Sequence, residues 1–426
     1  MNGSDRGLSR RAFVRSAVAI GGASALAACL QREETEDVPQ ATRALEELPD
    51  RQHAWNDFLA TDDHGNVEPP EHHLLLGLEY VGDGPAAAES ERERLEAAFR
   101  TLERAYERGN DGLAFTIGYG PTYFDRFDEE LPESVDLPAP EALAPIEDPQ
   151  LDEYDALLHL ASDHGHVTLS VEEALKGELD ELNGITVEDT FDGVFDVAER
   201  RTGFIGPGLP AERQSGVSGI PDSEPVPEDA PMFMGFKSGF RKTQASEDRV
   251  TIRDGPFAGG TTIHLSKIQL HLHQWYEQDS RDQRVAKMFS PTHAEDGLVE
   301  GVGDNLGDSS RVAEVGGSAA DDARNEGTVG HAQKAARARE DGEPIILRRD
   351  FDSTDDDQAA VHFLSLQRSI ADFVTTRRKM TGTDLTEGSV SSRTNNGILQ
   401  YLTVRSRANY LVPPRGRRAL PDPNPD

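Results

Sequence analysis

The histidine pairs of this sequence are the first residues whose spacing could serve chemistry. His271 and His273 stand two apart, as do His164 and His166, so in an extended segment each pair lies on one face. Zinc and copper sites use such pairs but need further ligands at fixed places. The chain has 13 histidines, and pairs of this spacing also arise by chance. We therefore expect no dedicated zinc or copper site from these pairs.

Motifs and composition exclude several other classes of protein. The sequence has no phosphate-binding loop, no serine hydrolase elbow and no dinucleotide fingerprint. Its 78 acidic and 43 basic residues give a net charge of −35, which repels nucleic-acid phosphates. With 36% hydrophobic residues and one cysteine, the chain is neither a multi-span membrane protein nor a disulfide scaffold. Only seven of the basic residues are lysines, so the acidic surface is typical of halophilic proteins, which stay hydrated in strong salt.

Residues 1–29 are typical of an export signal. Arg10 and Arg11 form a twin-arginine motif, and residues 17–28 form an apolar run about half as long as a membrane-spanning helix. The run closes on a lipoprotein cleavage box that ends at Cys29, which is either a lipidation site or a small buried hydrophobe. We favour lipidation and predict export by the twin-arginine route to the outer face of the cytoplasmic membrane. The lipid is then the only membrane anchor.

Two similar series of strands and helices must position any site. In the first series the apolar patterns predict strand 74–80, helix 95–106, strand 113–119, strand 155–161 and helix 171–182. In the second series they predict strands over 260–270, 345–348 and 361–366 and a helix over 369–380. This order is typical of ferredoxin-like units, so we predict an α+β fold of two such halves.

Composition predicts the boundaries of these parts. We expect an acidic tether over 30–69, an N-terminal half over 70–204, a Pro/Gly/Ser-rich linker over 205–234, a C-terminal half over 235–414 and a tail over 415–426. Residues 295–330 are rich in Gly, Ala and Asp and have no periodicity. A loop of that length inside a compact domain is usually functional or disordered.

Motifs in both halves resemble those of the dye-decolorizing peroxidases. Residues 115–125 are similar to the first-half signature of that family, and Gly235-Phe236-Lys237-Ser238-Gly239 stands in the place of its Gly-x-x-Asp-Gly motif. Further matching segments follow in the family's order: 259–275, 330–331, 345–349, 363–380 and 396–414. The resemblance covers residues 70–414 and is to a divergent, exported, haloarchaeal-like member. It implies that the two halves form a dimeric α/β-barrel-type fold with one haem b per chain.

The resemblance also implies roles for individual residues at the haem. His331 matches the histidine that binds the iron. Arg348 matches the arginine that stabilises negative charge as peroxide is cleaved. Ser238 stands where the family has a proton-transferring aspartate, and a serine hydroxyl holds a water but does not readily shuttle protons. Asp254 is the nearest carboxylate in the sequence, so it is our candidate for that proton transfer.

Two further positions depart from the family pattern. The arginine that follows the axial histidine and can pair with a haem propionate is missing, and Arg337 is the candidate to replace it. Asn396 stands where an acidic residue commonly bonds the axial histidine, and a neutral amide lets that histidine donate less electron density to iron. We therefore predict a weak haem-dependent peroxidase that reduces hydrogen peroxide and oxidises an unknown organic donor.

Two other functions stay open at this point. A non-catalytic cell-surface lipoprotein that binds or carries haem would use the same pocket without turnover. An acidic interaction module that has lost haem would not need His331 at all. Taken alone, His331 also suits a flexible loop, and Arg348 also suits a salt bridge at a strand end. The sequence leaves the electron donor and homo-oligomerisation open.

Overall fold

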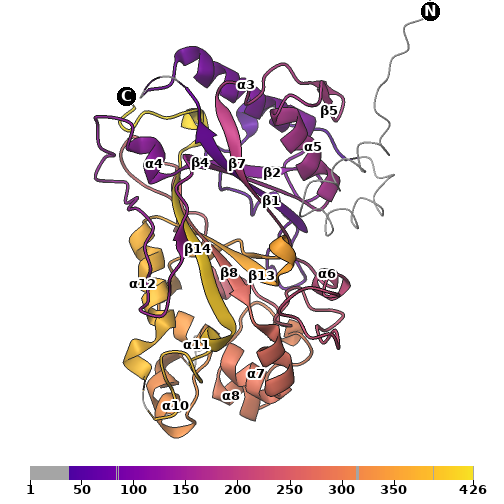
Figure 1. Cartoon of the computed structure of the whole chain (residues 1–426), viewed down its shortest axis with the longest axis vertical. Helices are drawn as coiled ribbons and strands as arrows, with labels where there is room; N and C mark the ends of the chain where they lie inside the picture. The colour runs from indigo at the N-terminus through magenta and orange to yellow at the C-terminus, as the bar shows by residue number, and fades with distance from the viewer. Residues whose placement is uncertain (1–37, 83, 85, 313–315, 387, 426) are drawn as a thin grey trace, which may run out of the picture.

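A computed structural model describes residues 38–425 of the chain, except residues 83, 85, 313–315 and 387. The predicted export signal and Cys29 lie outside the described residues. The protein has two lobes along its long axis, with the N-terminal half at one end and the C-terminal half at the other (Figure 1). Within the described ranges, no helix combines the length and the apolar character needed to cross a membrane.

Four antiparallel strands form the sheet of the N-terminal half: β1 (His72–Tyr80), β2 (Ala114–Tyr119), β4 (Ala156–Ser162) and β7 (Phe195–Phe204). They lie in the order β7-β1-β4-β2, as expected for a ferredoxin-like unit. Helices α3 (Glu89–Ala105) and α5 (Gly165–Leu175) pack against this sheet. The apolar stripe of α3, with Leu95, Phe99 and Leu102, is buried in the same core.

The C-terminal half repeats this arrangement with four strands: β8 (Thr261–Leu270), β11 (Leu347–Arg348), β13 (Ala360–Gln367) and β14 (Leu402–Val412). Their order, β11-β13-β8-β14, has the same neighbour relations as the first sheet. Helix α12 (Ile370–Thr381) packs on β13 and β8, and α11 (His331–Ala335) packs on α12. The far end of this lobe holds α7 (Arg281–Met288), α8 (Pro291–Glu295) and α10 (Ala319–Asn325) (Figure 1).

Two seams join the sheets into a closed antiparallel barrel. β2 pairs with β14 at Tyr119 and Leu411, and β12 (Phe351–Ser353) pairs with both β13 and β7. Apolar side chains from both halves share one core: Leu75, Leu157, Ile263, Leu265, Leu364 and Tyr410. The predicted α+β fold of two ferredoxin-like halves in a barrel is confirmed.

Short elements connect the main strands and helices. They are α4 (Pro121–Phe124), β3 (Gln150–Leu151), the pair β5 (Glu181–Leu182) and β6 (Ile185–Thr186), α6 (Leu209–Glu212), a π-helical turn (Gln274–Gln278) and the pair β9 (Arg339–Glu340) and β10 (Glu343–Pro344). The helix expected over 171–182 ends earlier, at Leu175, because Gly177 takes a left-handed φ of +75° and Leu182 enters β5.

The segments expected to be a tether and a linker are part of the fold. Within the tether range, residues 38–69 pack on the barrel, where Trp55 is 1% exposed and Gln52 donates to the carbonyls of Ile117 and Pro413. The linker range, 205–234, contributes Phe233 and other side chains to the core of the C-terminal half. Acidic and proline-rich composition concealed these anchoring residues, because a few buried side chains suffice to hold a segment.

Candidate functional site

One face of the C-terminal sheet gathers the side chains of a candidate site. Arg348 lies opposite Ser365 in the register of β11 and β13, and Phe363 lies opposite Ser266 of β8. Because side chains alternate between the faces of a strand, these residues share one face. Helix α12 covers this face, with the ring centroid of its Phe373 6.1 Å from that of Phe363.

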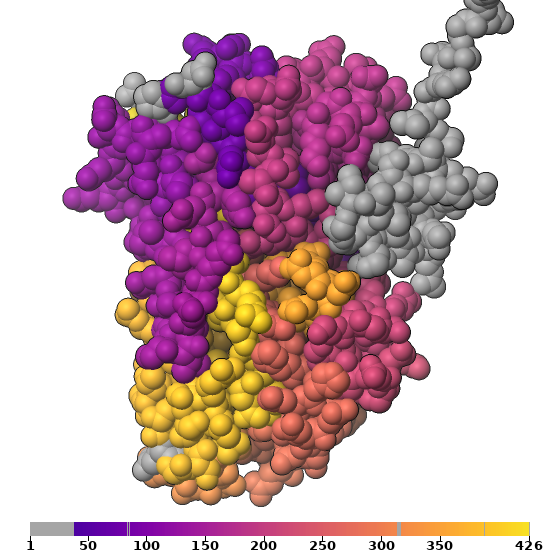
Figure 2. Space-filling view, in the orientation of Figure 1, coloured from indigo at the N-terminus to yellow at the C-terminus, as the bar shows by residue number. Residues whose placement is uncertain are grey.

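A cavity of about 280 Å³, here called the α12 cavity, lies between α12 and this sheet face. Its walls include the apolar side chains of Ile268, Phe363, Phe373, Met380, Leu399, Leu402 and Val404. Four guanidinium groups also line it, those of Arg377, Arg393, Arg405 and Arg407. One wall comes from residues 146–148, which belong to a segment of the N-terminal half, 125–149, that crosses to the C-terminal half beside α12 (Figure 1, Figure 2). The cavity thus combines flat apolar walls with positive charge.

A buried carboxylate, Glu147, links two of these guanidinium groups. It pairs with Arg377 and, at 2.8 Å, with Arg407, and its side chain is 3% exposed. Burial raises the pKa of Glu147, but the two guanidinium charges outweigh burial, so the net shift is downward and the carboxylate is charged. Sequence reasoning missed Glu147 because these partners are 230 and 260 residues away in the chain.

His331 begins α11 at a confined position and is not among the residues that line the α12 cavity. A Cβ added at Gly397 would lie 3.0 Å from both the backbone N and the Cα of His331. The His331 side chain is half-buried, and its imidazole has no hydrogen-bond partner within the part of the chain that the structure describes. Burial, together with the charges of Lys334, Arg348 and Arg377, lowers the pKa of His331 to about 3. The imidazole is therefore neutral and has a lone pair to offer.

Lys334, one turn after His331, is fully buried and ties α11 to α12. Its ammonium donates to the carbonyl of Met380 (2.7 Å), the carbonyl of Asn396 (2.9 Å) and Oδ1 of Asn396 (2.5 Å). The Asn396 amide in turn donates to the carbonyl of Thr381 at 3.0 Å. Asn396, predicted to stand beside His331 as the family's acidic residue does, therefore directs its side chain to Lys334 and to the end of α12.

A second cavity, of about 540 Å³, brings together Ser238 and Arg348. The side-chain amide of Gln244 holds the backbone of Arg348 twice, accepting from its N–H at 3.1 Å and donating to its carbonyl at 3.3 Å. The guanidinium of Arg348 is half-buried and has no ion-pair partner among residues 38–425 as described. A cation without an ion-pair partner can stabilise an anion that enters the cavity.

Two other predicted site residues lie elsewhere. Asp254 is exposed and is not among the residues that line the second cavity. Arg337 pairs with Asp384 at 2.8 Å, so its guanidinium is committed to that carboxylate. Asp350, which sequence reasoning missed, lines the second cavity together with Arg348. Its place two residues after Arg348 is the signal that could have found it.

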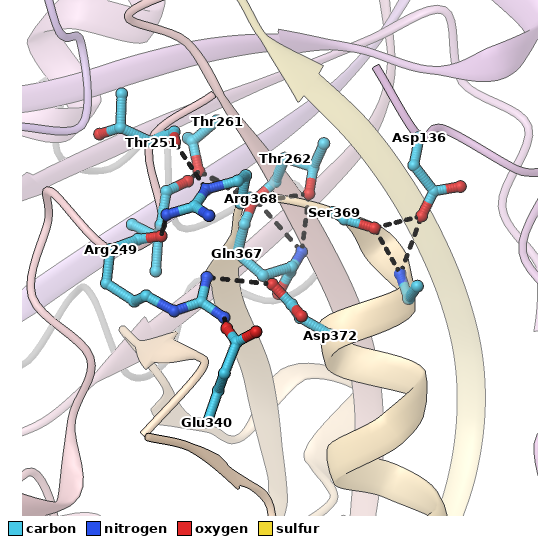
Figure 3. Close-up of polar contacts among 12 residues, drawn as sticks. Asp136, Arg249, Thr251, Thr261, Thr262, Glu340, Gln367, Arg368, Ser369 and Asp372 are labelled. Carbon is cyan, nitrogen blue, oxygen red and sulfur yellow. Dashed lines mark hydrogen bonds and ion pairs between the residues drawn. The ribbon is translucent and has the colours of Figure 1, made fainter. Parts of the chain in front are cut away.

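A polar network fixes the wall of the second cavity where it meets α12 (Figure 3). Arg249, which lines the cavity, pairs with Glu340 of β9 at 2.5 Å and with Asp372 of α12 at 3.4 Å. Arg368 donates to the backbone carbonyls of Thr251 (3.1 Å) and Arg249 (2.8 Å). These contacts commit the Arg249 guanidinium to the structure of the wall.

Comparison with known families assigns the chain to one protein family. The profile of a family of unknown function, DUF7405, matches residues 70–414. The chain belongs to this family. The matched range contains both halves of the barrel, His331, and Ser238 and Arg348 of the second cavity. No curated protein matches the sequence.

Solved structures similar to this DUF7405 protein include several DyP-type peroxidases. A protein from Shewanella oneidensis is 15% identical, with 82% of this chain and 94% of that chain covered and a TM-score of 0.53. The encapsulated enzyme from Mycobacterium smegmatis is also 15% identical, with 84% and 97% covered and a TM-score of 0.53. A DypB variant from Rhodococcus jostii in complex with heme is 16% identical, with 82% and 95% covered and a TM-score of 0.50. The resemblance to dye-decolorizing peroxidases is therefore confirmed at the level of the fold.

Proposed function

We propose that this DUF7405 protein binds one haem b through His331 and slowly reduces hydrogen peroxide while an organic donor is oxidised. The observation that carries the proposal is the half-buried imidazole of His331. It has no hydrogen-bond partner among the described residues and is exposed to the charges of Arg348 and Arg377. Support comes from the fold, which is shared with DyP-type peroxidases.

The residues present fit the chemistry of a haem site. A neutral imidazole is a common proximal ligand of haem iron. In the α12 cavity, Phe363 and Phe373 suit a flat apolar ring, and the guanidinium groups of Arg377 and Arg407 suit its carboxylates. When bound, haem would supply the redox-active iron at which peroxide is reduced.

The chain's own residues then have separate tasks. His331 would hold the iron, and Lys334 fixes the helix that carries His331. Arg348 stabilises negative charge on the peroxide oxygens but cannot act as the base, because a guanidinium stays protonated. Ser238 can hold a water in the same cavity. We assign the proton transfer to Asp350 in preference to the exposed Asp254, because Asp350 lines the cavity with Arg348.

Visible absorption spectra of the purified protein, with and without added haem, test this proposal. A Soret band displaced from that of free haem is expected. The variant His331→Ala should lose this band or change its coordination spectrum. The control His271→Ala should keep it, because that imidazole is engaged in a hydrogen bond with Thr403 at 2.8 Å. An unchanged spectrum in His331→Ala overturns the assignment.

A haem-binding or haem-carrying protein without turnover is the second candidate function. Ser238 favours it, because the aspartate that moves the proton in related peroxidases is replaced by a hydroxyl. Stopped-flow mixing of haem-loaded protein with hydrogen peroxide separates the two candidates, since only the peroxidase consumes peroxide with a donor present. We also propose that, whichever of the two functions it has, the protein is held at the cell surface by lipidation at Cys29.

A further inference from the structure

We infer that Arg377 and Arg407 form a binding site for the carboxylates of a tetrapyrrole, and that Glu147 occupies this site until the ligand displaces it. The inference rests on the proposed function, in which haem is that tetrapyrrole. The two arginines would supply the propionate contact that the family's arginine after the axial histidine makes and that is missing here. Arg337 does not offer this contact, because it is paired with Asp384.

The two arginines converge on one point from different elements. Arg377 lies on α12 and Arg407 on β14, and their side chains are 10% and 2% exposed. Glu147 reaches them from the other half of the barrel and is 3% exposed. The remaining polar neighbours of Arg407 are neutral, with its NH1 3.1 Å from both Nε2 of His264 and Oγ of Ser266.

The charges of this cluster do not balance. Two guanidinium groups and one carboxylate leave a net positive charge in a largely apolar cavity, which is costly unless an anion compensates it. The Nε–H of Arg407 is also buried and has no acceptor in the part of the chain that the structure describes. Both features indicate unused capacity to bind a carboxylate.

The cavity is small for a ligand pocket while Glu147 lies in its wall, so we expect a ligand to displace Glu147. At about 280 Å³ the α12 cavity lies just below the usual range for ligand pockets, about 300–1,000 Å³. Residues 146–148 form one wall of the cavity, and Ile146 is 39% exposed, so withdrawing it loses little apolar burial. Nearer its start, the crossing segment is held by Asp136, which accepts from the N–H of Ala371 at 2.9 Å and from Ser369 (Figure 3). Withdrawal at 146–148 therefore leaves that anchor intact.

The test uses metal-free protoporphyrin IX and its dimethyl ester in fluorescence titrations of the full chain. These probes differ only in their two carboxylates, and neither contains iron, so binding does not depend on ligation by His331. The wild type should bind the diacid more tightly than the diester. Glu147→Gln should raise this preference about tenfold by removing the competitor, and Arg377→Gln should lower it about tenfold. The ratio within each variant is insensitive to loss of folded protein.

Two control variants carry the same charge changes on the same cavity. Asp148→Asn and Arg405→Gln alter exposed residues of the α12 cavity wall and should leave the preference unchanged. Equal affinity for diacid and diester in the wild type, or an unchanged preference in Glu147→Gln and Arg377→Gln, overturns the inference. Carboxylate-dependent binding together with an unaltered haem spectrum in His331→Ala supports the inference and overturns the proposed function.

Discussion

Replacing Lys334 by methionine should loosen the helix that carries His331. Methionine keeps the length of the side chain and fills the space flexibly, but it removes the ammonium. That ammonium donates to the carbonyls of Met380 (2.7 Å) and Asn396 (2.9 Å) and to Oδ1 of Asn396 (2.5 Å). An ammonium has three N–H donors, so all three are in use. The variant leaves three acceptors without this donor.

The expected loss of stability follows from these contacts. A buried acceptor left without its donor costs about 1–3 kcal/mol, so three at the low end cost about 3 kcal/mol. Part of this cost is offset, because the variant no longer buries an ammonium, whose pKa burial lowers well below its ordinary value. We expect the free energy of unfolding of Lys334→Met to fall by about 2 kcal/mol.

Urea unfolding of the wild type and Lys334→Met measures this change, and haem titration reports the effect on His331. Adding Asn396→Leu removes the side-chain acceptor as well, so the double variant should lose less stability than the sum of the single variants. An unfolding free energy equal to that of the wild type, with unchanged haem affinity, would refute the view that Lys334 holds α11 in place.

Three further predictions concern the rate of peroxide consumption, attachment to the membrane and the pH dependence of stability. Ser238→Asp should speed peroxide consumption by haem-loaded protein about 10²-fold in stopped-flow experiments, since positioned acid–base groups contribute that much; an unchanged rate would mean that proton transfer does not pass through this position. Cys29→Ser should release the protein to the medium or leave it unprocessed, and fractionation with the membrane as in the wild type would contradict lipidation. Burial raises the pKa of Glu103, but hydrogen bonds from Arg415 and Arg418 lower it to about 2. The charged Glu103 carboxylate therefore stabilises the folded protein fully above about pH 4.5, and this stabilisation is lost as the pH falls towards 2. The free energy of unfolding should then depend less steeply on pH in acid in Glu103→Gln than in the wild type.

Long apolar runs made most strands of both halves predictable from the sequence. β1, β4 and β8 lie close to the expected ranges, because their side chains are buried almost throughout. β7 was not predicted, because Arg200 and Arg201 interrupt its apolar pattern. The fold accommodates them through ion pairs with Glu172 (2.9 Å) and Asp152 (2.8 Å), which lie in distant parts of the chain. Such compensation is invisible to a local pattern.

The candidate site was predictable where motifs carry its residues. Ser238 and Arg348 were expected in one site from the order of motifs, and the structure brings them to one cavity. Glu147 and Lys334 were not found, because each looks locally like an ordinary charged residue of a polar segment. Their environment depends on contacts across the barrel or between α11 and α12, and a charged side chain is buried only when such partners surround it.

The two acidic residues that this site lacks affect different steps of the proposed reaction. Ser238 in place of an aspartate removes a proton carrier and leaves the imidazole of His331 untouched. Asn396 in place of an acid removes an anionic partner for His331, and its amide oxygen is given to Lys334 instead. A histidine without such a partner donates less electron density to iron. Neither change removes the lone pair of His331 or the guanidinium groups of the α12 cavity, so haem binding and peroxide turnover should vary independently, with firm binding and slow turnover in the wild type.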